Sequence, residues 1–383
     1  MKNNFLYRLM FSAIIVLMLQ VSIGAKENTH DSLPDPMNTY QFNRKNYELQ
    51  NGKIDRKPWF EWWYYKVVLP NKNKSFFFVY GVVNPWDTSH SSSATRALVN
   101  VGSFSSNNII EERFPVAEFN ASYTTTQVNV GRYNLATDKR FLGQLTTAQG
   151  DRARWDISIN KKWAFNAESW ALGKNITNIE WYPAQADALC SGTLTINTEE
   201  ESFKDAPCYQ DRNWGTLFPE WWTWIVSNHF ENNPDSTLAL GGGKPTIFDH
   251  YNGFESVSIG LKHKGKTYEW RPHEGDYIKF EIKFGQWVVE ALNKKYRIKI
   301  KAYAAREKFM DLKFMTPQGQ WYHDYEALQG DLDLQLYEWN PMKQAWSEID
   351  RLISHQAGIE YGSYKVYDSN SLLALDLCLL GCQ

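Results

Sequence analysis

The stretch that decides the fold runs from Phe203 to Phe230 and reads FKDAPCYQDRNWGTLFPEWWTWIVSNHF. It combines tryptophans with acidic residues, prolines and a turn glycine. Each tryptophan carries a large apolar surface and one N–H group that needs a partner when buried. After Glu220 the aromatic and β-branched residues alternate as they do in a strand. One predicted face of this strand carries Trp222, Trp224, Val226 and Asn228, and the other carries Trp221, Thr223, Ile225 and Ser227.

The rest of the chain continues this strand pattern. Short runs of Val, Ile, Tyr, Phe and Trp alternate with turns rich in Gly, Asn, Asp and Pro, and few segments show a helical period. This pattern is typical of an all-β sandwich or barrel. The 41 basic and 43 acidic residues are closely mixed, with a net charge of -2. Because no basic patch stands out, nucleic acid is not expected as a partner.

An internal repeat predicts two similar β domains. Phe60–Trp63 (FEWW) opens an aromatic strand followed by a polar turn and a second strand, and Phe218–Trp222 (FPEWW) opens a matching hairpin later in the chain. The predicted domains are residues 45–210 and 211–370, followed by an apolar tail at 371–383. Ligand sites favour domain junctions, and the opening stretch lies at this one.

The N-terminal residues are typical of a secretory signal peptide. Lys2 and Arg8 precede the apolar run Leu9–Ile23, and small residues stand before a charged pair. We predict a signal peptide at residues 1–25, an exposed arm at 26–44 and export to the periplasm or the medium. An uncleaved anchor is the alternative, although the run is shorter than the roughly 20 residues of a membrane span.

The four cysteines fit an oxidising compartment. Cys190 and Cys208 flank two strand-like runs around an acidic tip, so a hairpin would bring them together, and we predict a disulfide between them. Cys378 and Cys382 are compatible with a tight disulfide or with a partner contact. No metal site is predicted, because no paired Cys or His with zinc spacing lies nearby.

Three segments together resemble the tocopherol cyclase family. WFEWWYYKVVLPNKNKSFFFVYGVVNP is similar to that family's FEGWYFKV and FCFMYSVENP strands, and the Phe203–Phe230 stretch is similar to its FEDAPSYxEKNWGxxFPxxWFWVQCNxF block. LQGDLDLQLYE, at Leu328–Glu338, resembles the GNLKLQLWE strand. The resemblance extends to the carotenoid hydratases and implies two lipocalin-like β-barrels in tandem.

The resemblance implies an intramolecular cyclase whose substrate is a prenylated hydroquinone or a related isoprenoid. Plant and cyanobacterial members close the chromanol ring of vitamin E. Such a ring closure delivers a proton to the prenyl alkene, and the phenol oxygen captures the resulting cation. It needs no cofactor, but it does need a carboxylic acid with a raised pKa, aromatic faces and a dry cavity. The hydrophobic substrate also points to peripheral membrane contact.

Two carboxylates are the candidate catalytic residues. Asp211 stands where the cyclase motif has Glu and the hydratase motif DHxWG has Asp, so we predict that it is the acid; pairing with Arg212 or capping a turn is the alternative. Glu61 matches the glutamate of FEGWYF and shares a strand face with Trp63. A proton relay is one role for Glu61, but we favour a buried structural carboxylate bonded to Arg or Tyr.

The resemblance also implies a set of substrate-binding residues, although ordinary barrel core is the alternative for each aromatic one. Two departures from the family pattern, Trp62 in place of glycine and Val226 in place of glutamine, predict a reshaped pocket. His229 and the run Tyr322-His323-Asp324 contain catalytic residue types, but we favour structural roles for them. The predicted substrate-binding residues are Trp63, Tyr64, Tyr80, Asn84, Arg212, Asn213, Trp214, Trp222, Trp224 and Asn228.

Three functional classes remain open from the sequence. The first is the cyclase just described. The second is an exported lipocalin-like carrier that binds a hydrophobic isoprenoid or lipid without turnover. The third is a secreted glycan-active protein, which would need a carboxylate pair at glycosidase spacing.

Overall fold

The computed structural model describes residues 35–42, 57–104, 108–247, 251–283, 285–367 and 372–377. Within these ranges there is no α-helix, and the helical segments are short 3-10 turns. They are Pro36–Asn38, Pro70–Lys72, Val116–Glu118, Ser169–Ala171, Pro272–Glu274 and Arg306–Lys308. A helix with the length and apolar character to cross a membrane is not found in this described part of the chain. Most of the remaining described residues form antiparallel strands, which turns and loops connect.

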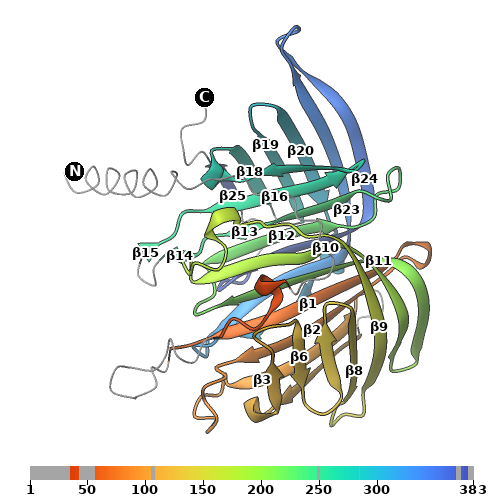
Figure 1. Cartoon of the computed structure of the whole chain (residues 1–383), viewed down its shortest axis with the longest axis vertical. Coiled ribbons are helices and arrows are strands. Elements are labelled where there is room, and N and C mark those ends of the chain that lie inside the picture. The colour runs from red at the N-terminus through yellow and green to blue at the C-terminus, as the bar shows by residue number, and fades with distance from the viewer. Residues whose placement is uncertain are drawn as a thin grey trace, which may run out of the picture. The chain divides into compact units, whose positions relative to one another are not determined.

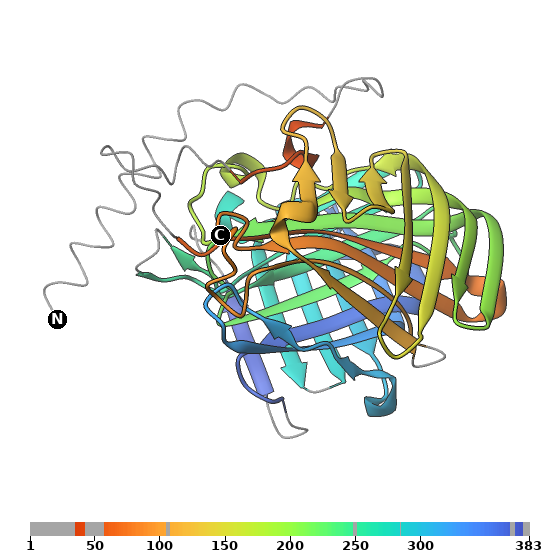
Figure 2. The ribbon, with the colours of Figure 1, turned by 90° about the horizontal axis from the view of Figure 1, so that it is seen from below.

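The first sheet has eleven strands. They are β1 (Phe60–Leu69), β2 (Lys74–Val83), β3 (Arg96–Ser103), β4 (Asn108–Phe114), β5 (Phe119–Ala121), β6 (Gln127–Val130), β7 (Asn134–Thr137), β8 (Arg140–Thr146), β9 (Arg152–Trp163), β10 (Ile179–Ile196) and β11 (Glu199–Gly215). Their spatial order is β4-β3-β2-β1-β11-β10-β9-β8-β7-β6-β5. Figure 2 shows how strongly this sheet curves.

The second sheet has twelve strands. They are β12 (Trp221–Ser227), β13 (Thr237–Gly243), β16 (Ser256–His263), β17 (Lys266–Trp270), β18 (Tyr277–Lys283), β19 (Gln286–Leu292), β20 (Tyr296–Tyr303), β21 (Met310–Asp311), β22 (Phe314–Met315), β23 (Trp321–Asn340), β24 (Ala345–Ser363) and β25 (Leu372–Leu377). The main path runs β17-β16-β13-β12-β24-β23-β20-β19-β18-β25, and β21 and β22 pair with β23. β14 (Thr246–Ile247) and β15 (Tyr251–Asn252) form a separate small sheet.

The two sheets share a layout. β1 pairs with β2 on one side and with β11 on the other, and β12 pairs in the same way with β13 and β24. The first strand of each sheet therefore lies beside the last long one. β1 begins one residue before its Glu-Trp-Trp run, and β12 begins at the first tryptophan of the second run. The predicted fold class, all-β with two lipocalin-like β-barrels in tandem, is confirmed. β11 crosses residue 210, where the sequence places the domain boundary; the boundaries themselves stay a prediction.

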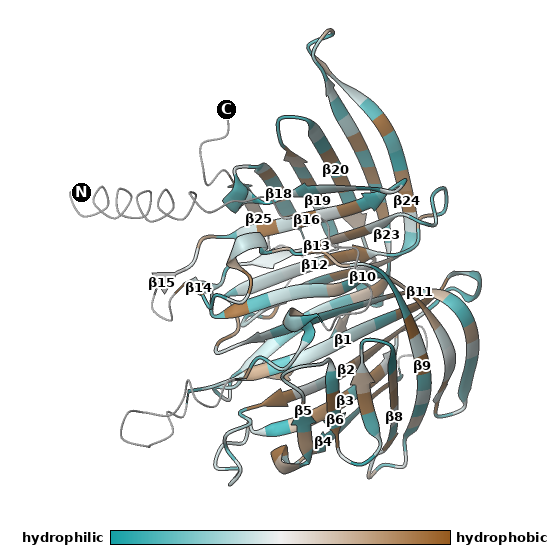
Figure 3. Ribbon diagram, in the orientation of Figure 1, coloured by the Kyte–Doolittle hydropathy of each residue, from teal (hydrophilic) through white to brown (hydrophobic). Residues whose placement is uncertain are grey.

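Each sheet curls around an apolar core of its own. Alternate residues of a strand point to opposite faces, and Figure 3 shows the resulting alternation of polar and hydrophobic bands along β9 and β24. The first core includes Val67, Phe78 and Trp155, and the second includes Ile225 and Leu334. Two further clusters of buried apolar side chains draw residues from both sheets, so the sheets are packed against each other.

Some predictions fall partly or wholly outside the described residues. The signal peptide at 1–25, most of the arm at 26–44, and Cys378 and Cys382 of the tail lie there, while residues 372–377 of the tail form β25. Cys190 on β10 and Cys208 on β11 are joined by a disulfide with their Cα atoms 5.8 Å apart. The two strands are direct neighbours, which is why the cysteines come within reach.

Candidate functional site

The sheets meet along β1 and β11 of the first sheet and β12, β23 and β24 of the second (Figure 1). The strand register sets which side chains face one another there. On the first sheet, Tyr64 of β1 lies directly opposite Asp211 of β11. On the second, Glu360 of β24 lies between its partners Glu326 of β23 and Trp224 of β12. These rows place carboxyl groups and aromatic rings together in the interface between the sheets.

Asp211 is buried, with 4% of its surface exposed. Its Oδ2 atom accepts hydrogen bonds from Trp181 Nε1 at 2.7 Å and from the Tyr209 hydroxyl at 2.8 Å. Its Oδ1 atom is buried and has no hydrogen-bond partner among the described residues. Burial raises the pKa of Asp211 to about 7, although the two donated hydrogen bonds act in the opposite direction. A large share of this carboxyl therefore carries a proton at neutral pH, and the proton belongs on the partner-free oxygen.

Glu326 reaches the first sheet from β23. The Tyr64 hydroxyl donates a hydrogen bond to Glu326 Oε1 at 2.5 Å. Burial, together with the nearby charges of Asp324 and Asp211, raises the pKa of Glu326 to about 8, against the effect of Tyr64 and Lys66. This glutamate is thus a second neutral carboxylic acid in the same interface at pH 7.

Asp324 and Glu360 form a carboxyl pair beside Glu326. Asp324 Oδ1 accepts a hydrogen bond from Trp222 Nε1 at 3.2 Å, and a hydrogen bond joins the two carboxyl groups. One member must be protonated to donate it. Burial raises the pKa of both, and the mutual charges raise that of Glu360 further. We call Asp211, Asp324, Glu326 and Glu360 the interface carboxyl cluster.

One basic side chain faces this cluster from β1. Lys66 is fully buried, and its Nζ donates to the Gln356 carbonyl at 2.8 Å. Burial lowers the pKa of Lys66 to about 7, which the charge of Glu326 partly opposes. Lys66 therefore carries only part of a positive charge near pH 7, and it does not neutralise all the carboxyl groups of the cluster. Among the described residues, no group of His, Cys, Asp and Glu is arranged to hold a metal ion.

Aromatic rings surround the cluster. The Trp224 ring lies edge-on to Tyr64 and Tyr209, with centroids 5.7 and 5.6 Å away, and its Nε1 donates to the Tyr209 hydroxyl at 3.2 Å. Trp222 packs against Tyr322 with the ring centroids 4.4 Å apart. Such rings present negative faces that stabilise a cation.

Glycines on the second sheet make room for these rings. A Cβ atom on Gly358 would come within 2.3 Å of the Trp224 ring, and one on Gly362 within 2.5 Å of Trp222. A Cβ on Gly241 would meet Trp181 at 2.7 Å. The indoles therefore lie directly on the backbone of β13 and β24, and they hold the carboxyls out of contact with water.

Glu61 lies on the opposite face of β1, inside the first sheet. It pairs with Arg212, accepts from the backbone N–H groups of Gln41 at 2.9 Å and Phe42 at 3.2 Å, and accepts from Trp59 Nε1 at 3.3 Å. Burial raises the pKa of Glu61, while the Arg212 charge and these hydrogen bonds oppose the rise. With both oxygens bonded, Glu61 is placed as a structural carboxylate of the first core.

The other predicted residues divide between the two faces. Arg212 lies over the rings of Trp63 and Trp214, at 4.6 and 4.5 Å from their centroids, within the first core. The Tyr80 hydroxyl, also there, donates to the Leu142 carbonyl at 2.8 Å. Asn84 joins the turn after β2 to the Pro317 carbonyl at 2.9 Å.

The remaining predicted residues belong to the interface side. Tyr64 lies on β1, Asp211 and Asn213 lie on β11, and Trp222 and Trp224 lie on β12. Asn228 directly follows β12 and continues its alternation. Asn228 Nδ2 donates to the Ala186 carbonyl at 2.5 Å. The structure therefore brings together one half of the predicted set and separates it from the half around Glu61.

Sequence reasoning missed several members of the interface. Glu326, Glu360, Tyr209, Trp181 and Lys66 had not been singled out, and Asp324 had been given a structural role. One signal was available on β23: Asp324 and Glu326 alternate on the same face as Tyr322 and Leu328, both of which are apolar and fully buried. Acids on a face with such neighbours are buried acids.

Comparison with known proteins gives the chain its family. It is 24% identical over 337 residues to "Probable tocopherol cyclase, chloroplastic" of Oryza sativa subsp. japonica, covering 74% of this chain and 70% of that protein. It is 26% identical over 360 residues to "Tocopherol cyclase, chloroplastic" of Zea mays, covering 80% and 75%. Kievitone hydratase from Nectria haematococca superimposes with a TM-score of 0.47 at 12% identity, over 80% of this chain and 90% of that one. The sequence model described as tocopherol cyclase-like matches residues 93–363, which is more than half of this sequence, and the chain belongs to that family.

Proposed function

We propose that the protein is an intramolecular cyclase that closes a chromanol-type ring on a prenylated hydroquinone or a related isoprenoid. The family supports a cyclase-like function and a hydrophobic prenyl quinol as substrate. The observation that carries the proposal is Asp211: a buried carboxyl whose one oxygen is held by two donors while the other has no partner. An alkene is a poor proton acceptor, and a neutral acid with no competing hydrogen bond is suited to protonate it.

The proposed reaction balances as an isomerisation. The proton on Asp211 Oδ1 passes to the less substituted alkene carbon and leaves a tertiary cation. The rings of Trp224 and Tyr209 beside Asp211 stabilise this cation. The phenol oxygen forms the C–O bond and releases its proton to a carboxylate of the interface carboxyl cluster, from which Asp211 is reloaded. No atom is gained or lost, and no cofactor takes part.

The site must open for this chemistry. The aromatic side chains contact one another around the carboxyls. A prenyl chain that reaches Asp211 therefore has to displace some of these rings, and substrate binding should change the tryptophan fluorescence. Once the prenyl chain is bound, the same rings exclude water, which would otherwise capture the cation and give a hydrated product.

Export is a second part of the proposal. It is supported by the disulfide between Cys190 and Cys208, since such bonds persist in oxidising compartments, and by the signal-like pattern of residues 1–25. The plant relatives carry the word chloroplastic in their names. We therefore propose that this chain acts on a quinol at or near a membrane outside the cytoplasm, through peripheral contact.

The test is to incubate the purified protein with a prenylated hydroquinone under reducing conditions and to follow mass and chromatographic retention. A cyclase leaves the mass unchanged and shifts the retention, whereas a carrier changes neither. Asp211→Asn should lower turnover by roughly 10²–10⁴, the usual worth of a positioned general acid. Ligand affinity should hold, because apolar burial at ~25 cal/mol per Å² dominates it.

Asp138→Asn is the matched control. Asp138, just after β7, is also an aspartate whose pKa is raised by burial, but it bonds Asn38 within the first sheet, away from the interface. Its replacement should leave turnover unchanged. Full activity in Asp211→Asn would remove Asp211 from the reaction, and wild-type protein that binds quinols without isomerising any of them would identify a carrier.

A further inference from the structure

A second candidate site lies at the edge of the first sheet, in the loop between β2 and β3. The loop is organised around Asp87, which is 3% exposed. Its carboxylate accepts hydrogen bonds from Ser91 N at 3.0 Å, Ser92 N at 3.0 Å and Thr95 Oγ1 at 2.6 Å, among others. Burial opposes ionisation, but these hydrogen bonds hold the pKa of Asp87 well below its usual value. The loop is therefore built to keep one shape.

Arg96 follows this loop at the start of β3 and is buried, with 6% of its surface exposed. Its Nη1 donates to the Ala94 carbonyl at 2.7 Å and its Nη2 to the Met315 carbonyl at 3.0 Å. Its Nε is buried, and no hydrogen-bond partner for it lies in the described part of the chain. No carboxylate of the described residues forms a salt bridge with Arg96; the charge of Glu111 favours its ionised form from a distance, and the neighbouring charge of Arg113 opposes it. Burying a charge without a salt-bridge partner is costly.

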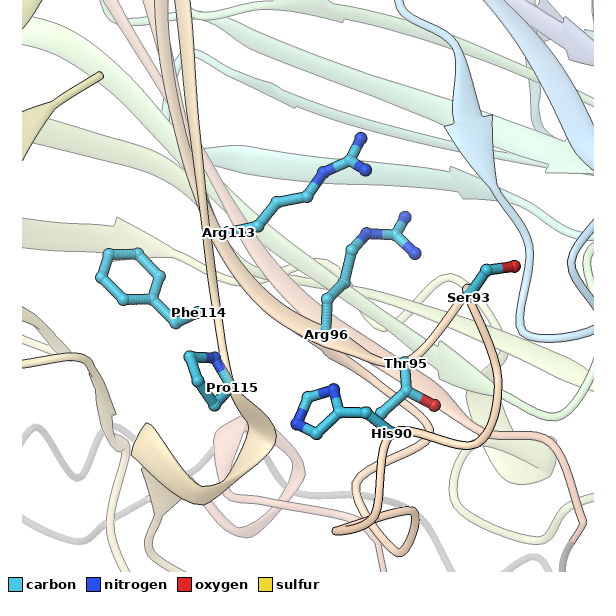
Figure 4. A pocket seen from close by; sticks show the side chains of 7 residues that line it. All are labelled: His90, Ser93, Thr95, Arg96, Arg113, Phe114 and Pro115. Atoms are coloured by element: carbon cyan, nitrogen blue, oxygen red, sulfur yellow. The ribbon is translucent and has the colours of Figure 1, made fainter. Parts of the chain in front are cut away.

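A cavity of about 360 Å³ opens beside this guanidinium. Arg113, from the adjacent strand β4, lines it as well, and Figure 4 shows the guanidinium groups of Arg96 and Arg113 pointing the same way. His90 and Ser93 add an imidazole and a hydroxyl from the loop. Glu111 pairs with Arg113 at 2.5 Å on the same face of the sheet, so one carboxylate serves two guanidinium groups. The residues that line the cavity thus include several hydrogen-bond donors and two guanidinium groups that share one carboxylate.

We propose that this cavity binds a phosphate group, through Arg96 and Arg113 with help from His90 and Ser93. Guanidinium groups fit the oxygens of a phosphate with paired N–H donors, and phosphate would balance the positive charge that Glu111 leaves on the Arg96 and Arg113 pair. A volume near 360 Å³ lies at the low end of ligand pockets. Two sources share this chemistry: inorganic phosphate or a small phosphate ester in solution, and the headgroup of an anionic phospholipid.

The proposal is independent of the ring-closing chemistry, because its readout is binding. Inorganic phosphate is titrated into the full chain by calorimetry in a buffer free of other oxyanions. Wild-type protein should bind it saturably. Arg113→Gln should weaken binding by roughly 10- to 100-fold, the usual worth of hydrogen bonds to a charged group, and Arg96→Met should abolish it. Met keeps the apolar stem and removes the buried charge but leaves the Ala94 and Met315 carbonyls without this donor, so a urea midpoint is measured on the variant to confirm that it folds.

Arg140→Gln is the matched control. Arg140 has 54% of its side chain exposed, against 53% for Arg113, and it pairs with Asp156 as Arg113 pairs with Glu111. Its loss should leave phosphate binding unchanged. Co-sedimentation with phosphatidylglycerol vesicles, compared with phosphatidylcholine vesicles, separates the two sources. Retention on the anionic vesicles that Arg113→Gln removes would assign a headgroup, and phosphate binding without retention would assign a soluble ligand.

Two results would overturn the proposal. One is the absence of saturable phosphate binding together with vesicle retention that does not depend on Arg96 and Arg113. The other is an equal loss of binding in Arg113→Gln and Arg140→Gln, since that would reduce the effect to general surface charge.

Discussion

Tyr64 and Glu326 stand 262 residues apart in the chain, yet the Tyr64 hydroxyl donates a 2.5 Å hydrogen bond to the Glu326 carboxyl across the interface between the two sheets. The bond links a strand that opens the first sheet to one near the end of the second. It lies among four carboxyl groups with raised pKa values, so the docking of the sheets and the protonation of the cluster depend on each other.

The free energy of unfolding should therefore fall as the pH rises between about 4 and 8. Ordinary carboxyls titrate near ~4 in the unfolded chain, whereas Asp211 and Glu326 have folded pKa values of about 7 and about 8. The folded protein thus holds more protons in this window, and stability present below the window is lost through it. Each group contributes a slope of up to ~1.4 kcal/mol per pH unit. Urea midpoints across the window measure the slope.

Glu326→Gln should flatten this slope, because the amide does not titrate and still accepts from Tyr64. Asp156→Asn is the comparison: the Arg140 hydrogen bond lowers the pKa of Asp156, so its removal should shift stability by a constant amount across this window and alter the pH slope only below pH ~4. A wild-type stability that rises from pH 5 to 8 would contradict the raised pKa values.

Glu61→Gln should cost stability, in contrast to Asp211→Asn. Glu61 neutralises Arg212 where both side chains are fully buried, and removing one partner of such a pair costs about 3–5 kcal/mol. Asp211→Asn removes a buried acid with a partner-free oxygen and should change the unfolding free energy far less. Chemical denaturation of both variants is the measurement. A stable Glu61→Gln variant that loses only turnover would instead make Glu61 a catalytic residue.

Gly358→Ala should loosen the interface. The new Cβ would lie 2.3 Å from the Trp224 ring, and overpacking of this kind costs about 1–3 kcal/mol. Because Trp224 bonds Tyr209, which in turn bonds Asp211, turnover should fall as well. Gly81→Ala on β2 is the milder counterpart, since its closest contact is 3.2 Å, to the Cβ of Trp62. Unfolding midpoints and turnover are compared between the two, and equal effects would mean that Trp224 adapts freely.

The disulfide between Cys190 and Cys208 should stabilise the β10–β11 hairpin. The cysteines are 18 residues apart, and a loop of that size is worth about 3 kcal/mol in the chain-entropy picture. A Cys190→Ser and Cys208→Ser double variant should lose this amount and become insensitive to reductant. Rapid alkylation of both thiols in the native, unreduced protein would show that the bond does not form.

Strand alternation predicted part of the site well. It placed Trp222 and Trp224 on one face of a strand, and both point from β12 toward the first sheet. The same rule separates Glu61 and Trp63 from Tyr64, because neighbouring positions on a strand face opposite sides. The motif resemblance had gathered residues from both faces into one predicted pocket, and a run of consecutive strand residues cannot line a single cavity.

The interface carboxyl cluster lay beyond what local patterns predict. Glu326 and Glu360 lie opposite each other because of the register that β23 and β24 take beyond their bulges, and Asp211 joins them because the sheets dock face to face. Both facts depend on contacts between residues far apart in the chain. Strand alternation predicts the face of the sheet on which a side chain lies, but it does not predict which surface of the second sheet packs against that face.

The interface carboxyl cluster draws its residues from both sheets, and this limits which parts of related proteins can be recombined. Asp211 comes from the first sheet, while Trp224, Glu326 and Glu360 come from the second. A fragment that stopped after β11 would lose the second sheet that covers Asp211, and the pKa of Asp211 would fall, because burial is what raises it. A chimera of two relatives would keep this raised pKa only if both parents place matching rings and carboxyls at the interface between the sheets. Substitutions on the two sides of the interface should therefore be correlated.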